Sequence, residues 1–256
     1  MKFSANLGFL WADLQLPEAI HAAKAAGFDA VECHWPYGCP SSEVANALNQ
    51  SGLPMLGLNT VRGDLNAHEF GLSALEGRQA DARAAIDQAI AYGADIRAGA
   101  VHVMAGKASG ALATEVFENN LNYACDRAAA VGMTVLIEPI NQRDVPGYFL
   151  HTIRQAVEII ERLARAELRL MFDCYHVALT EGDVMAAYKA CRSYIGHIQF
   201  ARVPDRGAPN GGDVDYTRLL RDIAHDGWNR PFGAEYRVDG VTEASLGWMQ
   251  AFRSDE

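Results

Sequence analysis

Short apolar runs alternate along the whole chain with longer stretches in which apolar residues recur every three or four positions. The short runs are typical of buried parallel strands, and the recurring spacing is typical of helices that pack on a sheet. The predicted strands are 2–7, 29–34, 54–60, 100–104, 134–138, 168–173, 195–200 and 232–236. The predicted helices are 16–28, 41–52, 76–92, 112–131, 151–165, 181–191, 214–225 and 242–252.

Eight strand-then-helix units predict an α/β fold, the (β/α)₈ or TIM barrel, in one domain that spans residues 1–256. A doubly wound open sheet also alternates strands with helices, but this number of units in a chain of this length favours the barrel. The first predicted strand is not followed by the glycine-rich fingerprint of dinucleotide-binding folds. The longest irregular segment, 59–77, follows the third predicted strand, and we expect it to form a lid or a wall over the barrel mouth.

Composition and charge narrow the class of partner. The formal net charge is −10, and the 22 Lys and Arg residues are scattered, so nucleic acid is not an expected partner. The chain has no leader-like N-terminus and no apolar stretch of membrane-spanning length, and we expect a cytoplasmic protein. The five cysteines form no CxxC pair, so we expect reduced thiols. An acidic surface does not attract anionic substrates, and a site for one would need its own cations.

Four oxygen-bearing side chains lie in the last or next-to-last position of the last four predicted strands: Glu138, Asp173, Gln199 and Glu235. The carboxyl ends of barrel strands form the catalytic face, so we expect these side chains to converge on one cavity. Three carboxylates at such distances repel one another unless a cation or protons neutralise them. A single acidic residue at a strand end is more often a helix cap or an ion-pair partner, but four in succession predict a metal site. Oxygen ligands without thiolates or clustered imidazoles favour Mg²⁺ or Mn²⁺.

Two further side chains follow these strand ends. His176 lies three residues after Asp173, in a predicted loop above the rim, where it could bind a substrate oxygen, carry a proton or cap the loop. Arg206 lies on a Pro/Gly-rich loop seven residues after Gln199, where a fixed cation would suit an anionic or polyhydroxy substrate. A lone arginine on such a loop is more often a solvated charge.

Two more cations, Arg62 and Lys107, follow the third and fourth predicted strands, and both are candidates to bind a substrate carboxylate. His102 lies inside an apolar strand, and we expect it to be a core histidine with a hydrogen-bond partner. No Gly-x-Ser-x-Gly motif or recognisable cysteine-enzyme pattern is present, which argues against a covalent nucleophile.

The predicted rim suits the movement of a proton next to a carbonyl. A divalent ion bound to adjacent carbonyl and hydroxyl oxygens acidifies the neighbouring C–H, and a carboxylate can then remove the proton. A second carboxylate across the substrate can exchange a proton at the other carbon. Glu138 and Glu235 are placed for these two roles, which would support aldose–ketose isomerisation or epimerisation through an enediolate.

Several motifs of the chain resemble the hydroxypyruvate isomerase family, within the xylose-isomerase-like TIM barrels and close to the 2-oxo-tetronate isomerases. The resemblance covers essentially the whole chain and is specific to this group in its combination of motifs. The motifs are "NTVRGD" (59–64), "HVMAGK" (102–107), "LIEPIN" (136–141), "FDCYH" (172–176), "HIQFARVPDRGAP" (197–209) and "GAEY" (233–236).

The resemblance implies that Glu138, Asp173, Gln199 and Glu235 bind the metal and that the two glutamates are the proton donor and acceptor. It implies that His176 and Arg206 contact the substrate. It also implies interconversion of hydroxypyruvate and tartronate semialdehyde, a carboxylated pair that would give the other two cations a role. Related ketose 3-epimerases usually have a histidine ligand on strand seven, so Gln199 fits the hydroxypyruvate branch and counts against an epimerase.

The same residues are compatible with other functions. A 2-oxo-tetronate isomerase, or a related isomerase or epimerase of sugars or keto acids, would use the same site on a longer substrate. A polyol dehydratase would use a similar metal and base but must expel water. A metal-dependent nuclease would need a histidine cluster and a basic face, and an inactive binding module would not need all four rim residues. The sequence is compatible with a homo-oligomer and does not decide its size.

Overall fold

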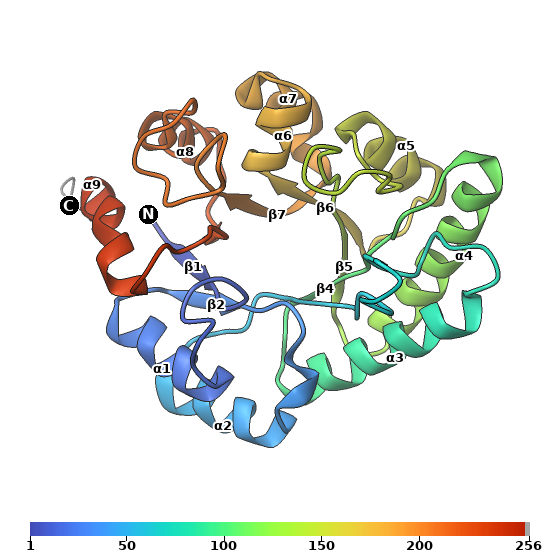
Figure 1. Ribbon diagram of the computed structural model, residues 1–256, viewed down its shortest axis with the longest axis horizontal. Coiled ribbons are helices and arrows are strands. Elements are labelled where there is room, and N and C mark those ends of the chain that lie inside the picture. Colours follow the sequence, from blue (N-terminus) through green and yellow to red (C-terminus); the bar gives the residue numbers. More distant parts are fainter. Residues whose placement is uncertain (254–256) are drawn as a thin grey trace.

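Eight parallel strands form a barrel with helices around its outside in the computed structural model, which describes residues 1–253 (Figure 1). The strands are β1 (Phe3–Asn6), β2 (Ala30–Glu32), β3 (Leu58–Asn59), β4 (Ala100–His102), β5 (Thr134–Ile137), β6 (Leu168–Asp173), β7 (Ile195–Phe200) and β8 (Phe232–Ala234). The helices are α1 (Leu16–Ala25), α2 (Ser41–Ser51), α3 (Gln79–Asp95), α4 (Gly110–Ala129), α5 (Ile153–Leu163), α6 (Cys174–Thr180), α7 (Val184–Cys191), α8 (Tyr216–His225) and α9 (Gln250–Arg253). Short 3₁₀ helices are η1 (Pro36–Gly38), η2 (Arg192–Tyr194) and η3 (Thr242–Met249). The predicted TIM barrel is therefore confirmed.

The barrel closes between its second and third strands. The ladder order is β2-β1-β8-β7-β6-β5-β4-β3, and every pairing is parallel. Backbone hydrogen bonds join β2 and the residue after it to the segment just before β3: from Val31 N to Pro54 O (3.0 Å), from Leu56 N to Val31 O (2.7 Å) and from Cys33 N to Gly57 O (3.1 Å). All strand ends therefore point to one common rim.

Helix α5 shows how the amphipathic segments cover the sheet. Its buried residues are Ile153, Ala156, Ile159 and Ile160, which recur at helical spacing on one face. The hydroxyl of Thr152 accepts a hydrogen bond from the Gln155 amide and so caps the first turn. Burial of a branched apolar side chain contributes roughly 1.5–3 kcal/mol, so this stripe holds the helix on the barrel.

Two stretches depart from the predicted elements. Residues 174–180, expected to be a loop, form α6 directly after β6, and α7 begins only at Val184. The predicted final helix is mostly η3, a 3₁₀ helix, with α9 after it. The additional helix matters because it carries His176.

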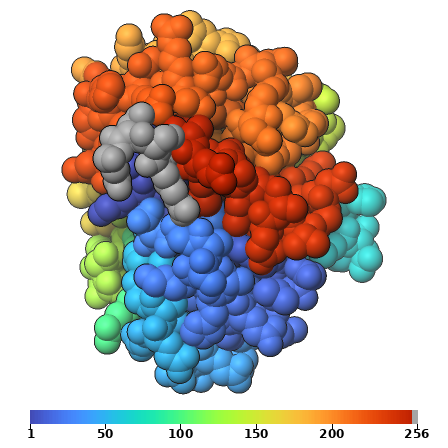
Figure 2. Space-filling view, turned by 90° about the vertical axis from the view of Figure 1, so that its left-hand side faces the viewer, coloured from blue at the N-terminus to red at the C-terminus, as the bar shows by residue number. Residues whose placement is uncertain are grey.

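The C-terminal segment packs across the first strand. The ring of Phe3 lies 4.9 Å from that of Trp248 and 5.1 Å from that of Phe252, both in edge-on contact. Figure 2 shows the red C-terminal segment lying against the blue N-terminal region. Among the described residues, no helix combines the length and the apolar character needed to cross a bilayer.

Candidate active site

A cavity of about 300 Å³ opens at the carboxyl ends of the strands. Its lining comes from loops all round the barrel, including His34 after β2 and Glu235 after β8. The segment 59–77 forms part of the wall, to which it contributes Arg62 and Phe70. Small-molecule sites occupy roughly 300–1,000 Å³, so this cavity suits a small ligand.

Asp173, the last residue of β6, has two roles that depend on different oxygens. Its Oδ1 accepts a hydrogen bond from Tyr175 N at 2.9 Å and caps α6. Its Oδ2 is buried and has no hydrogen-bond partner within residues 1–253; the nearest cationic atom is an Arg206 guanidinium nitrogen at 3.5 Å. The helix-cap role and the rim role proposed from sequence are therefore compatible.

Glu138 and Gln199 present similar free oxygens. Glu138 lies one residue beyond β5 and lines the cavity, whereas Gln199 lies within β7, below the cavity lining. The Gln199 amide donates from Nε2 to Glu32 Oε1 at 2.9 Å. Glu138 Oε1 and Gln199 Oε1 are buried without a hydrogen-bond partner in the described part of the chain.

This donor set fits a divalent cation. Buried polar atoms almost always have partners, so three free oxygens on the ends of neighbouring strands need an explanation. Carboxylate oxygens of Glu138 and Asp173 lie within 4.8 Å of each other and of a ring nitrogen of His176, so the two carboxylates are close enough to share one ion. Burial raises the pKa of Glu138 well above its usual value, with a further increase from Glu235 and Asp173. Burial also raises the pKa of Asp173 to about 7. A hard cation would favour the ionised form of both.

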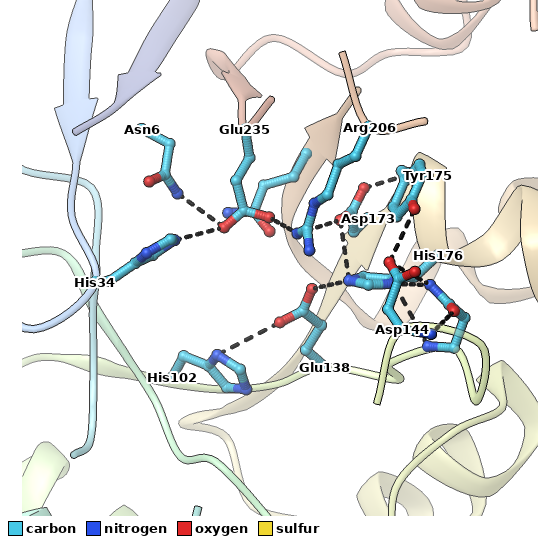
Figure 3. Close-up of polar contacts among 12 residues, drawn as sticks. Asn6, His34, His102, Glu138, Asp144, Asp173, Tyr175, His176, Arg206 and Glu235 are labelled. Atoms are coloured by element: carbon cyan, nitrogen blue, oxygen red, sulfur yellow. Dashed lines mark hydrogen bonds and ion pairs between the residues drawn. The ribbon is translucent and has the colours of Figure 1, made fainter. Parts of the chain in front are cut away.

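Glu235, one residue beyond β8, differs from these residues because both of its carboxylate oxygens have partners. Its Oε1 accepts from Asn6 Nδ2 at 2.9 Å and lies 2.9 Å from His34 Nε2, and its Oε2 accepts from Arg206 (Figure 3). Burial alone would raise the pKa of Glu235, but the charge of Arg206 and the hydrogen bond to His34 lower it to about 2. The two glutamates therefore differ: one is held ionised and the other tends to hold a proton.

His176 lies in α6, not in a loop as the sequence suggested, and its ring nitrogens have different roles. Asn141 Oδ1 accepts the Asp144 amide at 2.9 Å, so Nδ2 of the same side chain faces His176 Nδ1 at 2.6 Å. This hydrogen bond makes Nδ1 the acceptor and leaves the proton on Nε2. His176 Nε2 is 3.6 Å from Glu138 Oε1 and 3.5 Å from Asp173 Oδ2. A protonated Nε2 is a donor rather than a metal ligand.

The predicted cations have different positions. Arg206 lies on its loop over the cavity with a left-handed backbone φ of 60°, held by hydrogen bonds to Arg202 and Arg237. The Arg62 guanidinium lies 4.0 Å from the centre of the Trp35 ring, in the cavity wall. Lys107 is exposed and does not line the cavity.

Two histidines of the site were not expected from the sequence. His34 contacts Glu235, and His102, taken for a core residue, lines the cavity with Nδ1 3.5 Å from Glu138 Oε2 (Figure 3). Together with His176 they surround the cavity, so the assumption that imidazoles do not cluster here was wrong. Burial lowers the pKa of His102 to about 4 and that of His176 well below its usual value, so both rings are neutral. Only the position of these histidines at strand ends could have indicated their role.

The chain is similar to several known proteins. A family model described as the xylose isomerase-like TIM barrel matches residues 20–252. The 2-oxo-tetronate isomerase of Cupriavidus necator is 40% identical over 98% of both chains. The hydroxypyruvate isomerase of Escherichia coli is 31% identical over 99% of this chain and 100% of that protein. A crystal structure from Brucella melitensis, described as an AP endonuclease of family 2, has a TM-score of 0.93 and 32% identity over 98% of both chains.

Proposed function

Because this chain belongs to the xylose isomerase-like TIM barrel family and is an isomerase, we propose that it interconverts hydroxypyruvate and tartronate semialdehyde (2-hydroxy-3-oxopropanoate). The observation that carries the proposal is the set of three unpartnered buried oxygens, on Glu138, Asp173 and Gln199. With Glu235, these residues would hold one Mg²⁺ or Mn²⁺. Such an ion, when bound, polarises a substrate carbonyl and acidifies the adjacent C–H.

Two carboxylates perform the proton transfers in this proposal. In hydroxypyruvate, one glutamate takes a proton from C3, which converts the C2 carbonyl and C3 hydroxyl into an enediolate. Return of a proton to C2, with transfer of the C3 hydroxyl proton to the C2 oxygen, gives the aldehyde and the new C2 hydroxyl. Glu138 and Glu235 come from β5 and β8 and both line the cavity, so they can reach the two carbons.

Neutral and cationic donors would hold the substrate in place. His176 Nε2–H can donate to a substrate oxygen beside Glu138. Arg206 Nε is buried without a hydrogen-bond partner in residues 1–253 and offers a second donor. Arg62 makes no ion pair with any described residue, and its packing on Trp35 restricts its motion. We therefore assign the substrate carboxylate to Arg62. A charge-assisted hydrogen bond of this kind contributes roughly 1.5–3 kcal/mol to binding.

If Arg62 binds the substrate carboxylate, removal of this cation should weaken substrate binding, whereas removal of a cation outside the cavity should not. Arg62→Ala should raise KM for hydroxypyruvate by about 10- to 100-fold with a smaller change in kcat, as expected for a lost binding interaction. Lys107→Ala is the matched control, because Lys107 is exposed and outside the cavity lining. Steady-state kinetics of both variants would measure this, and equal KM changes would contradict the assignment.

A four-carbon 2-oxo-tetronate is the second candidate substrate. The relative at 40% identity carries that name, and a cavity of about 300 Å³ leaves room for one more carbon. The same residues would catalyse the same proton transfers. The Brucella protein is described as an endonuclease, but this chain has a net charge of −10, which opposes binding to nucleic acid phosphates. We therefore do not propose a nucleic acid substrate.

Turnover assays of the purified protein with added Mg²⁺ or Mn²⁺ test the proposal, with hydroxypyruvate and 2-oxo-tetronates compared by kcat/KM. Turnover in D₂O, followed by NMR, should place deuterium at the newly formed C–H bond, since the proton passes through a carboxyl group. Absence of metal-dependent isomerisation of either substrate, with Glu138→Gln behaving as the wild type, would refute the proposal. A preference for the four-carbon substrate would leave the chemistry intact and reassign the substrate.

A further inference from the structure

A buried carboxylate lies inside the barrel beneath the proposed metal ligands. Glu32, the last residue of β2, is 3% exposed. It accepts hydrogen bonds from four side chains on two strands: Ser4 and Asn6 on β1, and His197 and Gln199 on β7. Burial of a carboxylate costs several kcal/mol unless such partners compensate for lost hydration, so a purely structural core has little reason to contain one.

The barrel wall leaves space for this carboxylate at one glycine. Gly233 on β8 pairs in register with Ser4 on β1 and Gln199 on β7. A Cβ atom at Gly233 would lie 2.7 Å from Glu32 Oε1 and 2.9 Å from Gln199 Cγ. Only glycine therefore lets the Glu32 side chain reach across to the amide of Gln199.

The contacts of Glu32 fix the orientation of two groups of the proposed site. Because Gln199 Nε2 donates to Glu32 Oε1 at 2.9 Å, the amide oxygen must face away from Glu32, and that oxygen is one of the three without a partner. Asn6 Nδ2 is shared between Glu32 Oε1 at 3.2 Å and Glu235 Oε1 at 2.9 Å. One buried carboxylate thus contacts Gln199 directly and Glu235 through an amide.

We propose that Glu32 is a positioning residue for the metal site: it holds the Gln199 oxygen toward the ion and restrains Glu235 through Asn6. This inference rests on the proposed function. Removal of a residue that hydrogen-bonds to a metal ligand commonly lowers metal affinity or activity by about 10- to 100-fold. Glu32 does not contact the substrate cavity, so its effect on substrate KM should be small compared with its effect on metal binding.

The test is the Mn²⁺ affinity of metal-free protein, measured by isothermal titration calorimetry. Glu32→Gln keeps the size of the side chain but can offer its own N–H to Gln199, which removes the preference for one amide orientation. It should weaken Mn²⁺ binding by about 10- to 100-fold. Gly233→Ala, which displaces Glu32 without changing its charge, should also weaken binding. Gly57→Ala is the matched control, because its Cβ would meet nothing closer than 3.6 Å.

A coupling measurement separates positioning from general stability. In a Gln199→Ala background, Glu32→Gln should weaken Mn²⁺ binding by a factor several times smaller than in the wild type, because the group on which it acts is gone. Thermal unfolding of the same variants shows whether each is folded. If either Glu32→Gln or Gly233→Ala does not fold, the Mn²⁺ affinity of the variant that folds tests the inference. If wild-type protein neither binds Mn²⁺ nor isomerises the substrates, the proposed function fails. If it does both and the folded Glu32 and Gly233 variants bind Mn²⁺ as tightly as Gly57→Ala, the inference about Glu32 alone is overturned.

Discussion

Replacement of Glu138 by glutamine should have opposite effects on stability and on metal binding. Glu138 Oε1 is buried and has no hydrogen-bond partner among the residues described, and burial and neighbouring carboxylates raise the pKa of the side chain. A glutamine of nearly the same shape removes the cost of burying this carboxyl group, whether ionised or protonated, and supplies an N–H donor in place of one buried oxygen. The metal-free variant should therefore be more stable than metal-free wild type, although it has lost a proposed ligand and proton carrier.

The magnitude follows from the unpaired oxygen. An unsatisfied buried acceptor costs about 1–3 kcal/mol, which is the gain expected from the substitution. At about 2.1 cal/mol/K per residue, unfolding of 256 residues has an entropy of about 540 cal/mol/K, so each kcal/mol shifts Tm by about 2 °C. The metal-free variant should melt about 2–6 °C above metal-free wild type. Mn²⁺ at about 100 times its Kd should raise the wild-type Tm by about 5 °C, corresponding to about 2.7 kcal/mol.

Differential scanning calorimetry of chelated protein, with and without Mn²⁺, measures both effects. The variant should gain little from Mn²⁺ and should lose isomerase activity. Glu158→Gln, an exposed change on α5, is the control and should stay within about 0.5 kcal/mol of wild type with an unchanged response to Mn²⁺. A variant that melts below metal-free wild type, or gains as much from Mn²⁺ as wild type does, would show that this carboxylate is not an unpaired metal ligand.

Two further substitutions test the support of the site and of the fold. A Cβ at Gly8 would lie 2.1 Å from His34 Nδ1, so Gly8→Ala must move the ring that lies 2.9 Å from Glu235 Oε1. Steady-state kinetics should show kcat/KM reduced by about 10- to 100-fold. Gly38→Ala, with no atom within 4 Å of its Cβ, should retain wild-type kinetics, and equal activity of the two would contradict the role of the ring. Thr152→Ala removes the cap of α5 and should cost about 1 kcal/mol, or about 2 °C in Tm, with Thr152→Ser restoring most of it.

The fold and the rim could be predicted from sequence because both follow from local patterns. Apolar runs define the strands wherever both faces are buried, and the residue at the end of each run is then at the rim. Glu138, Asp173 and Glu235 lie at or one residue beyond the strand ends in the structure. Helix α6 was missed because it has only seven residues, begins directly after a strand and buries its first four, so no amphipathic period marks it.

The layer below the rim could not be predicted, since it depends on register between strands far apart in sequence. In "DAVECH" (29–34) Glu32 looks like the solvent-facing residue of an alternating strand. It becomes an interior residue only because Asn6 pairs with it, and its carboxylate reaches Gln199 only because Gly233 lacks a Cβ. A glycine in the sequence does not reveal which side chain needs its space. Rim residues can therefore be identified from single strands, whereas the residues that orient them require the three-dimensional pairing of β1, β2, β7 and β8.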